Sequence, residues 1–165
     1  MRIQTAAMLC CGLTAALVGA GRASRVTGAP PAAGGLCTPA EVPLFSCSIG
    51  AKRVSICGAG QHAAYRYGLP GKIELSSTQL TFAEKAFSGG GETQITATNK
   101  DYSYTVFDRT VRTSLGEDGR HDPAFGSGLL IRHNGKVVAT RPCDEDVPIV
   151  ARARTMIPAG PYIAH

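Results

Sequence analysis

The feature of this sequence that most limits its fold is a strict alternation of apolar and polar residues. Residues 45–49 read Phe-Ser-Cys-Ser-Ile, and residues 102–106 read Tyr-Ser-Tyr-Thr-Val. A period of two places successive side chains on opposite faces of a β-strand, whereas a helix needs apolar residues every three to four positions. Turn-forming runs such as residues 68–71 and 134–135 separate these stretches. We therefore expect antiparallel strands joined by short turns.

Several further stretches show the same pattern, and each predicts a strand: residues 54–57, 65–67, 73–75, 92–98, 128–133 and 136–141. Strands at this spacing are typical of β-sandwiches and β-barrels. The predicted fold is all-β, an antiparallel sandwich or barrel of about seven to eight strands that is stabilised by disulfides. Residues Leu80–Phe87 are left open between a strand and a single helical turn.

The first 23 residues have the pattern of an export signal peptide. Arg2 supplies a positive start, and residues 6–20 form an apolar run. Residues 21–23 place small side chains three residues and one residue before a cleavage site after Ala23, and cleavage after Ala20 is the alternative. The run is too short to span a membrane comfortably, and no later stretch approaches that length. We expect an exported protein, periplasmic or extracellular, without an integral membrane span after cleavage.

Removal of this signal changes the charge and the cysteine count. Losing Arg2 and Arg22 lowers the net charge from +5 to +3, and no block of Lys and Arg with interleaved aromatics remains. Nucleic acid is therefore not an expected partner. Cys10 and Cys11 lie in the signal run without the Leu-x-small pattern that precedes a lipidated cysteine, so they are interpreted as ordinary members of that run.

The remaining cysteines are Cys37, Cys47, Cys57 and Cys143. An even number in an exported chain predicts two disulfides, and the lack of a Cys-x-x-Cys pair gives no support for a redox or zinc site. If Ile49 lies opposite Val54, Cys47 and Cys57 point to opposite faces of their hairpin. The expectation is therefore that Cys37 and Cys143 each pair with one of these two cysteines, in either combination.

The chain divides into four predicted regions. Residues 1–23 are the signal peptide, residues 24–36 are a flexible leader rich in Pro and Gly, and residues 37–143 are the β domain. Residues 144–165 begin with three acidic residues and contain three prolines, which predicts a loosely held tail. If that tail docks as a further strand, its apolar residues Ile149 and Val150 are expected to be buried.

The sequence contains no motif that indicates a catalytic residue, a cofactor or a metal. The histidines lack metal-binding spacing, and residues 126–128 lack the Gly-x-Ser-x-Gly pattern of a hydrolase elbow. Residues 118–122 resemble a calcium loop only in part, because Arg120 occupies a ligand position and cannot bind a cation.

The segment Asp108–Ser127 is the strongest candidate for a binding surface. Its length between two predicted strands is unusual for a loop in a compact domain, and long loops often carry function. Arg109, Arg112, Arg120 and His121 are the predicted contact residues, because guanidinium groups pair well with carboxylates. A solvated loop with local ion pairs is the alternative.

Several stretches of the chain resemble a family of small exported bacterial proteins of uncharacterised function. The residues that carry the resemblance are Leu44–Cys47, Val54–Cys57, Tyr65–Leu75, Gly89–Glu92, Tyr102–Tyr104 and the strand ending near Cys143. The resemblance covers residues 37–143 and implies an exported β domain without known catalytic residues. In size, export and disulfide use the chain is also similar to envelope β-barrels that inhibit C-type lysozymes, although their inhibitory motif has no match here.

Together these features predict an exported β-rich protein that acts by binding a protein or glycan partner in the envelope, with inhibition of a lysozyme-type hydrolase as one form of that activity. One alternative is a small secreted enzyme that uses the 108–127 segment, with His121 as acid or base beside Asp118 or Asp122. The other alternative is a structural component of the envelope.

Overall fold

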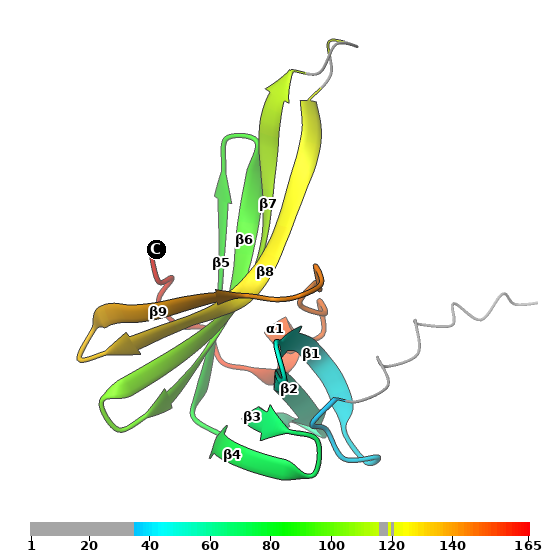
Figure 1. Cartoon of the computed structure of the whole chain (residues 1–165), viewed down its shortest axis with the longest axis vertical. Helices are drawn as coiled ribbons and strands as arrows, with labels where there is room; N and C mark the ends of the chain where they lie inside the picture. Colours follow the sequence, from blue (N-terminus) through cyan, green and yellow to red (C-terminus); the bar gives the residue numbers. More distant parts are fainter. Residues whose placement is uncertain (1–34, 116–118, 120) are drawn as a thin grey trace, which may run out of the picture.

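The computed structural model describes residues 35–115, 119 and 121–165, and within them two antiparallel sheets form a disulfide-stabilised β-sandwich (Figure 1). Sheet A has the order β1-β2-β3-β4, with β1 Val42–Ile49, β2 Lys52–Ala59, β3 His62–Leu69 and β4 Lys72–Ser77. Sheet B has the order β5-β6-β7-β8-β9, with β5 Leu80–Phe87, β6 Gly90–Asn99, β7 Tyr102–Leu115, β8 His121–His133 and β9 Lys136–Pro142. A single short helix, α1, covers Ala153–Met156.

The predicted all-β class is confirmed, and the described strands number nine rather than seven to eight. The additional strand is β5, which resolves the open interpretation of Leu80–Phe87 in favour of a strand. No helix of the described residues is long and apolar enough to cross a membrane.

The core lies between the facing sides of the two sheets. On sheet B, the residues Phe82, Ile95, Val106 and Leu129 lie directly opposite one another on four neighbouring strands, and all four are buried. Sheet A contributes buried side chains from the alternate positions of its strands: Phe45, Cys47, Val54, Ile56 and Tyr65. The alternation in the sequence is thus the alternation between core and outer faces.

The disulfides follow the predicted partition of the cysteines. Cys37 pairs with Cys57, and Cys47 pairs with Cys143. The β1–β2 turn is tighter than expected, because Ile49 pairs with Lys52 and Cys47 lies opposite Val54. Since this shifts the register by two residues, Cys47 and Cys57 still point to opposite faces, as the prediction required.

Each disulfide attaches a flanking segment to sheet A. Residues before β1 cross its outer face, where the Leu36 amide donates to Ser55 Oγ at 3.1 Å. Arg66 donates to the Leu36 carbonyl at 3.0 Å and binds both carboxylate oxygens of Glu41. The Cys47–Cys143 bridge joins β1 to the end of β9, and so connects the two sheets covalently.

Residues 144–165 are packed against the sandwich rather than loosely held. Ile149, Ala153, Met156 and Ile157 are buried in the core cluster, whereas Val150 is exposed. The segment then passes the edge of β5, where the Phe82 amide donates to Pro158 and the Gly160 amide donates to the Phe82 carbonyl, each at 2.8 Å. The prolines prevent regular structure without preventing burial, because the apolar residues between them still reach the core.

The prediction of a long loop over residues 108–127 is wrong. β7 continues to Leu115 and β8 begins at His121, so residues 108–115 and 121–127 form paired strands of a hairpin that projects from the sandwich (Figure 1). The sequence there has no apolar alternation because much of the hairpin is exposed and buries no continuous face. The strands continue there through their backbone hydrogen bonds, although the sequence lacks apolar alternation.

Candidate functional site

The projecting hairpin is the first candidate site, and we call residues 108–115 and 121–127 the arm. At its base, β6 still pairs with β7 as far as Gly90 opposite Val111. Beyond this point only β7 and β8 pair, through Arg112 opposite Pro123 and Leu115 opposite His121. A two-stranded ribbon has little stability of its own, so the arm depends on the sheet from which it grows.

The structure separates two of the predicted contact residues, Arg109 and Arg112. Arg109 lies on the outer side of sheet B and is bound to Glu92, whereas Arg112 lies on the opposite face of β7 and is exposed. His121 is exposed, with Nδ1 2.6 Å from the Thr113 carbonyl oxygen. Arg120 lies outside the described residues, as do Asp118 and the predicted signal peptide.

The arm instead presents Phe125, which the sequence analysis did not single out. Its side chain lies on the same face of the arm as Arg112 and is 61% exposed. Below it is a cavity of about 320 Å³, which we call the notch and which is lined by Asp108, Phe125, Gly126, Asp146, Val147 and Pro148. An exposed aromatic ring beside an apolar recess is a common anchor in protein interfaces.

Ser127 and Asp108 hold the far wall of the notch in place. Ser127 Oγ donates to the Glu145 carbonyl at 3.1 Å and accepts from the Val147 amide at 3.0 Å. Asp108 Oδ2 accepts from the Ile149 amide at 3.1 Å. These contacts fix the 145–149 backbone against β7 and β8, so this wall of the notch is held in place.

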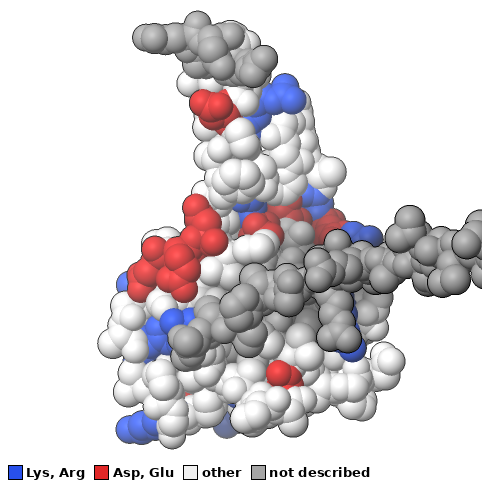
Figure 2. All heavy atoms as spheres, turned by 90° about the vertical axis from the view of Figure 1, so that its right-hand side faces the viewer, with Lys and Arg blue, Asp and Glu red and all other residues white. Residues whose placement is uncertain are grey.

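The notch is acidic. Burial raises the pKa of Asp108, the negative charges of Asp146 and Glu92 raise it further, and the Ile149 amide lowers it. Asp144 and Glu145 precede Asp146 in the chain. Figure 2 shows Asp and Glu side chains gathered just below the base of the arm. The site therefore offers an aromatic ring and a recess in which a positive charge would be favoured.

A second candidate site is a polar cluster on the outer side of sheet B. The Glu92 side chain is fully buried there, and Arg109 Nε donates to Glu92 Oε2. His165 Nε2 lies 2.9 Å from Glu92 Oε1, and Gln94 Nε2 donates to the same oxygen at 2.5 Å. Burial opposes the ionisation of Glu92, but the hydrogen bonds from Gln94, His165 and Arg109 together hold its pKa below the usual value. The sequence offers no local signal for this cluster because its members are far apart in the chain.

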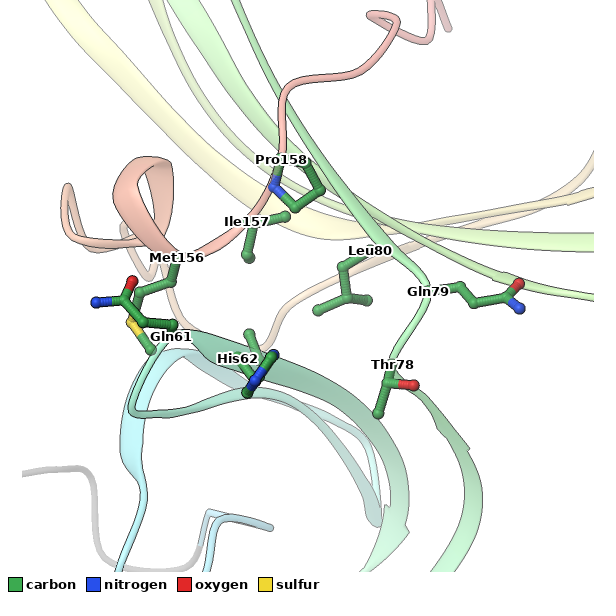
Figure 3. Close-up of a pocket in the computed structure, with 9 residues that line it drawn as sticks. Gln61, His62, Thr78, Gln79, Leu80, Met156, Ile157 and Pro158 are labelled. Carbon is green, nitrogen blue, oxygen red and sulfur yellow. The ribbon is translucent and has the colours of Figure 1, made fainter.

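A third site is a cavity of about 570 Å³ between the two sheets (Figure 3). It lies between the β2–β3 turn, the β4–β5 connection and the end of α1, where Gln61, Leu80 and Met156 line it. His62 is the one ionisable side chain among its described lining residues. A single exposed histidine without a carboxylate beside it does not form an acid–base pair.

Within the described part of the chain, no group of three or more His, Cys, Asp or Glu is placed to hold a metal ion. No family model matches the chain, and no curated protein and no solved structure is significantly similar to it. Functional arguments therefore rest on the geometry of these sites alone.

Proposed function

We propose that this is an exported binding protein that holds a cationic protein partner with the arm and the notch. The observation that carries the proposal is Phe125, a large aromatic side chain exposed on a projecting hairpin beside an acidic recess with an apolar lining. Interface anchors are enriched in aromatic residues of this kind. Inhibition of a lysozyme-type hydrolase is the form of binding that we propose to test first.

The chemistry of the notch supports a partner with a basic side chain. An Arg or Lys stem would lie along Val147 and Pro148, and its charged end would reach Asp108 and Asp146. Ionisation of Asp108 is disfavoured in the free protein, so a cation in the notch would lower the pKa of this residue. We therefore expect affinity to fall as salt increases.

The two disulfides support export as part of the proposal. Such bonds form and persist in oxidising compartments and are rare in the reducing cytosol. A periplasmic or extracellular location would also give the arm access to envelope proteins.

The experiment is a binding measurement with immobilised oxidised protein against a C-type lysozyme, a panel of other peptidoglycan hydrolases and an envelope extract. Phe125→Ala removes the aromatic anchor, and Asp146→Asn removes a notch charge. Val138→Ala is the matched control, because Val138 is an exposed apolar residue on β9, 56% exposed.

We expect a saturable partner that binds the wild type and Val138→Ala equally and binds Phe125→Ala at least about tenfold more weakly. Asp146→Asn should weaken binding and reduce its dependence on salt. A partner held equally well by Phe125→Ala would overturn the assignment of the site. Absence of any saturable partner from the panel and the extract would contradict the binding function.

A further inference from the structure

We infer that the outer side of sheet B carries a second binding site, a groove for an extended polypeptide with a histidine side chain. In this chain, residues 159–165 occupy the groove in cis. The inference is independent of the arm and the notch. It rests on how the sheet holds this segment at three successive positions.

The first position is the edge of β5. Ala159 forms a parallel bridge with Phe82: the Phe82 amide donates to the carbonyl of the preceding residue, Pro158, and the Phe82 carbonyl accepts from the Gly160 amide, each at 2.8 Å. This is the geometry of an added strand, in which backbone groups at a sheet edge recognise an extended chain without regard to its side chains.

The second position is Gln94, whose side chain is fully buried on the outer side of the sheet. Its Nε2 donates to the Ile163 carbonyl at 2.7 Å, and its Oε1 accepts from the Ile163 amide at 2.8 Å. A side-chain amide that pairs with both backbone groups of one residue imitates a β-ladder. Such a contact also accepts any residue other than proline at that place in the bound chain.

The third position gives the groove its chemical preference. Two residues after Ile163, the imidazole of His165 contacts the buried Glu92 carboxylate and packs against Phe107, with the rings tilted by 43° and their centroids 4.8 Å apart. The His165 side chain is 10% exposed. Arg109 already pairs with Glu92 Oε2 and lies 3.1 Å from His165 Nε2, so this position favours a planar side chain that hydrogen-bonds to Glu92 Oε1 without adding a second fixed positive charge. The groove therefore recognises the backbone amide and carbonyl of one residue and, two residues later, a side chain of this kind.

The segment also fits closely between these contacts. A Cβ on Gly160 would lie 2.4 Å from Thr81 Cβ, so a larger residue there cannot be accommodated without displacement. Gly160→Val should therefore release residues 159–165 from the groove and leave the buried residues of the core in place. Ile163→Pro is a second variant that should release the segment. It removes the amide hydrogen that Gln94 Oε1 accepts, and it changes no core residue.

The test uses the full chain and a fluorescent, C-terminally amidated peptide with the sequence of residues 158–165, because the Pro158 carbonyl accepts from the Phe82 amide. Binding is measured by anisotropy to wild type, Gly160→Val and Ile163→Pro. A peptide with alanine in place of its histidine tests the preference for the third position. Val138→Ala is the control, since Val138 is an exposed residue of β9 in the same sheet and lies outside the segment, the arm and the notch.

We expect either releasing variant to bind the peptide at least about tenfold more tightly than wild type or Val138→Ala, in which the groove is occupied. The alanine peptide should bind at least about fivefold more weakly than the histidine peptide. Binding of a scrambled peptide with equal affinity would overturn the inference. So would a failure of folded Ile163→Pro to bind the peptide. Both outcomes leave the arm proposal untouched, because Gly160→Val and Ile163→Pro change no residue of the arm or the notch.

Discussion

The body of the sandwich and the arm are built from the same two strands, β7 and β8, but their side chains meet different surroundings. In the body, Val106 and Leu129 are paired across the strands and are buried between two sheets. In the arm, Leu115 and Phe125 are 62% and 61% exposed. The comparison separates two tasks: the body supplies the free energy of folding, and the arm presents side chains that contribute little to it.

The largest effect is expected from the bond that closes the body. The Cys47–Cys143 disulfide closes a loop with a sequence separation of 96, against 20 for Cys37–Cys57. A chain-entropy model gives losses of about 4.7 and about 3.3 kcal/mol on removing them. Denaturant unfolding of the two double variants, Cys47→Ser with Cys143→Ser and Cys37→Ser with Cys57→Ser, measures the two losses of unfolding free energy. Equal losses, or a larger loss for the shorter loop, would contradict this order.

The next prediction compares the stability lost on truncating a buried residue with that lost on truncating an arm residue of similar size. Ile95→Ala in β6 should lower the free energy of unfolding by about 2–5 kcal/mol, since Ile95 is fully buried and its loss leaves a cavity. Leu115→Ala in the arm should change it by less than about 0.5 kcal/mol. Urea titrations of the two variants provide the measurement, and a comparable loss for Leu115→Ala would show that the arm has a stabilising role.

A smaller effect is expected on the pH dependence of stability, from the ion pair between Arg66 and Glu41, the residue before β1. The Arg66 guanidinium bonds to Glu41, and together with the bonds from Thr38 it lowers the pKa of Glu41 to about 2. Because the folded pKa lies below the unfolded value, this contribution to stability is present above about pH 4.5 and is lost as the pH falls towards 2.

Glu41→Gln should therefore reduce the slope of unfolding free energy against pH between about 4.5 and 2, and it should destabilise the protein most near neutral pH. Thermal unfolding at several pH values measures the slope. The Lys52–Glu74 pair on sheet A provides a control in Glu74→Gln, because it is an exposed ion pair of small expected effect. A slope in Glu41→Gln equal to that of the wild type would contradict the assigned role of Glu41.

The difference between body and arm also explains what the sequence could reveal. Body strands such as 45–49 and 102–106 are visible because one face of each is apolar. The arm was mistaken for a loop because Arg109 and Arg112 lie on opposite faces and leave neither face apolar. Four cysteines after the predicted signal peptide, together with the alternation over residues 45–57, predicted two disulfides and their partition.

The candidate sites were less accessible to sequence reasoning. Phe125 lies among charged and small residues, and only its context in a ribbon shows that it is exposed. Glu92 and His165 are separated by 73 positions, so no spacing rule links them. In residues 144–165, Ile149, Ala153 and Met156 recur at intervals of three to four, a signal of burial that the prolines obscured.

The division between body and arm depends most on Phe125 contacting the partner rather than stabilising the fold. The most direct test measures two quantities on Phe125→Ala and on the control Val138→Ala: the free energy of unfolding, and the affinity for the partner found with the wild type. We expect both variants to unfold within about 0.5 kcal/mol of the wild type, and only Phe125→Ala to lose affinity, by at least about tenfold. Unchanged affinity in Phe125→Ala, or a loss of stability of the size expected for Ile95→Ala, would contradict the division between body and arm.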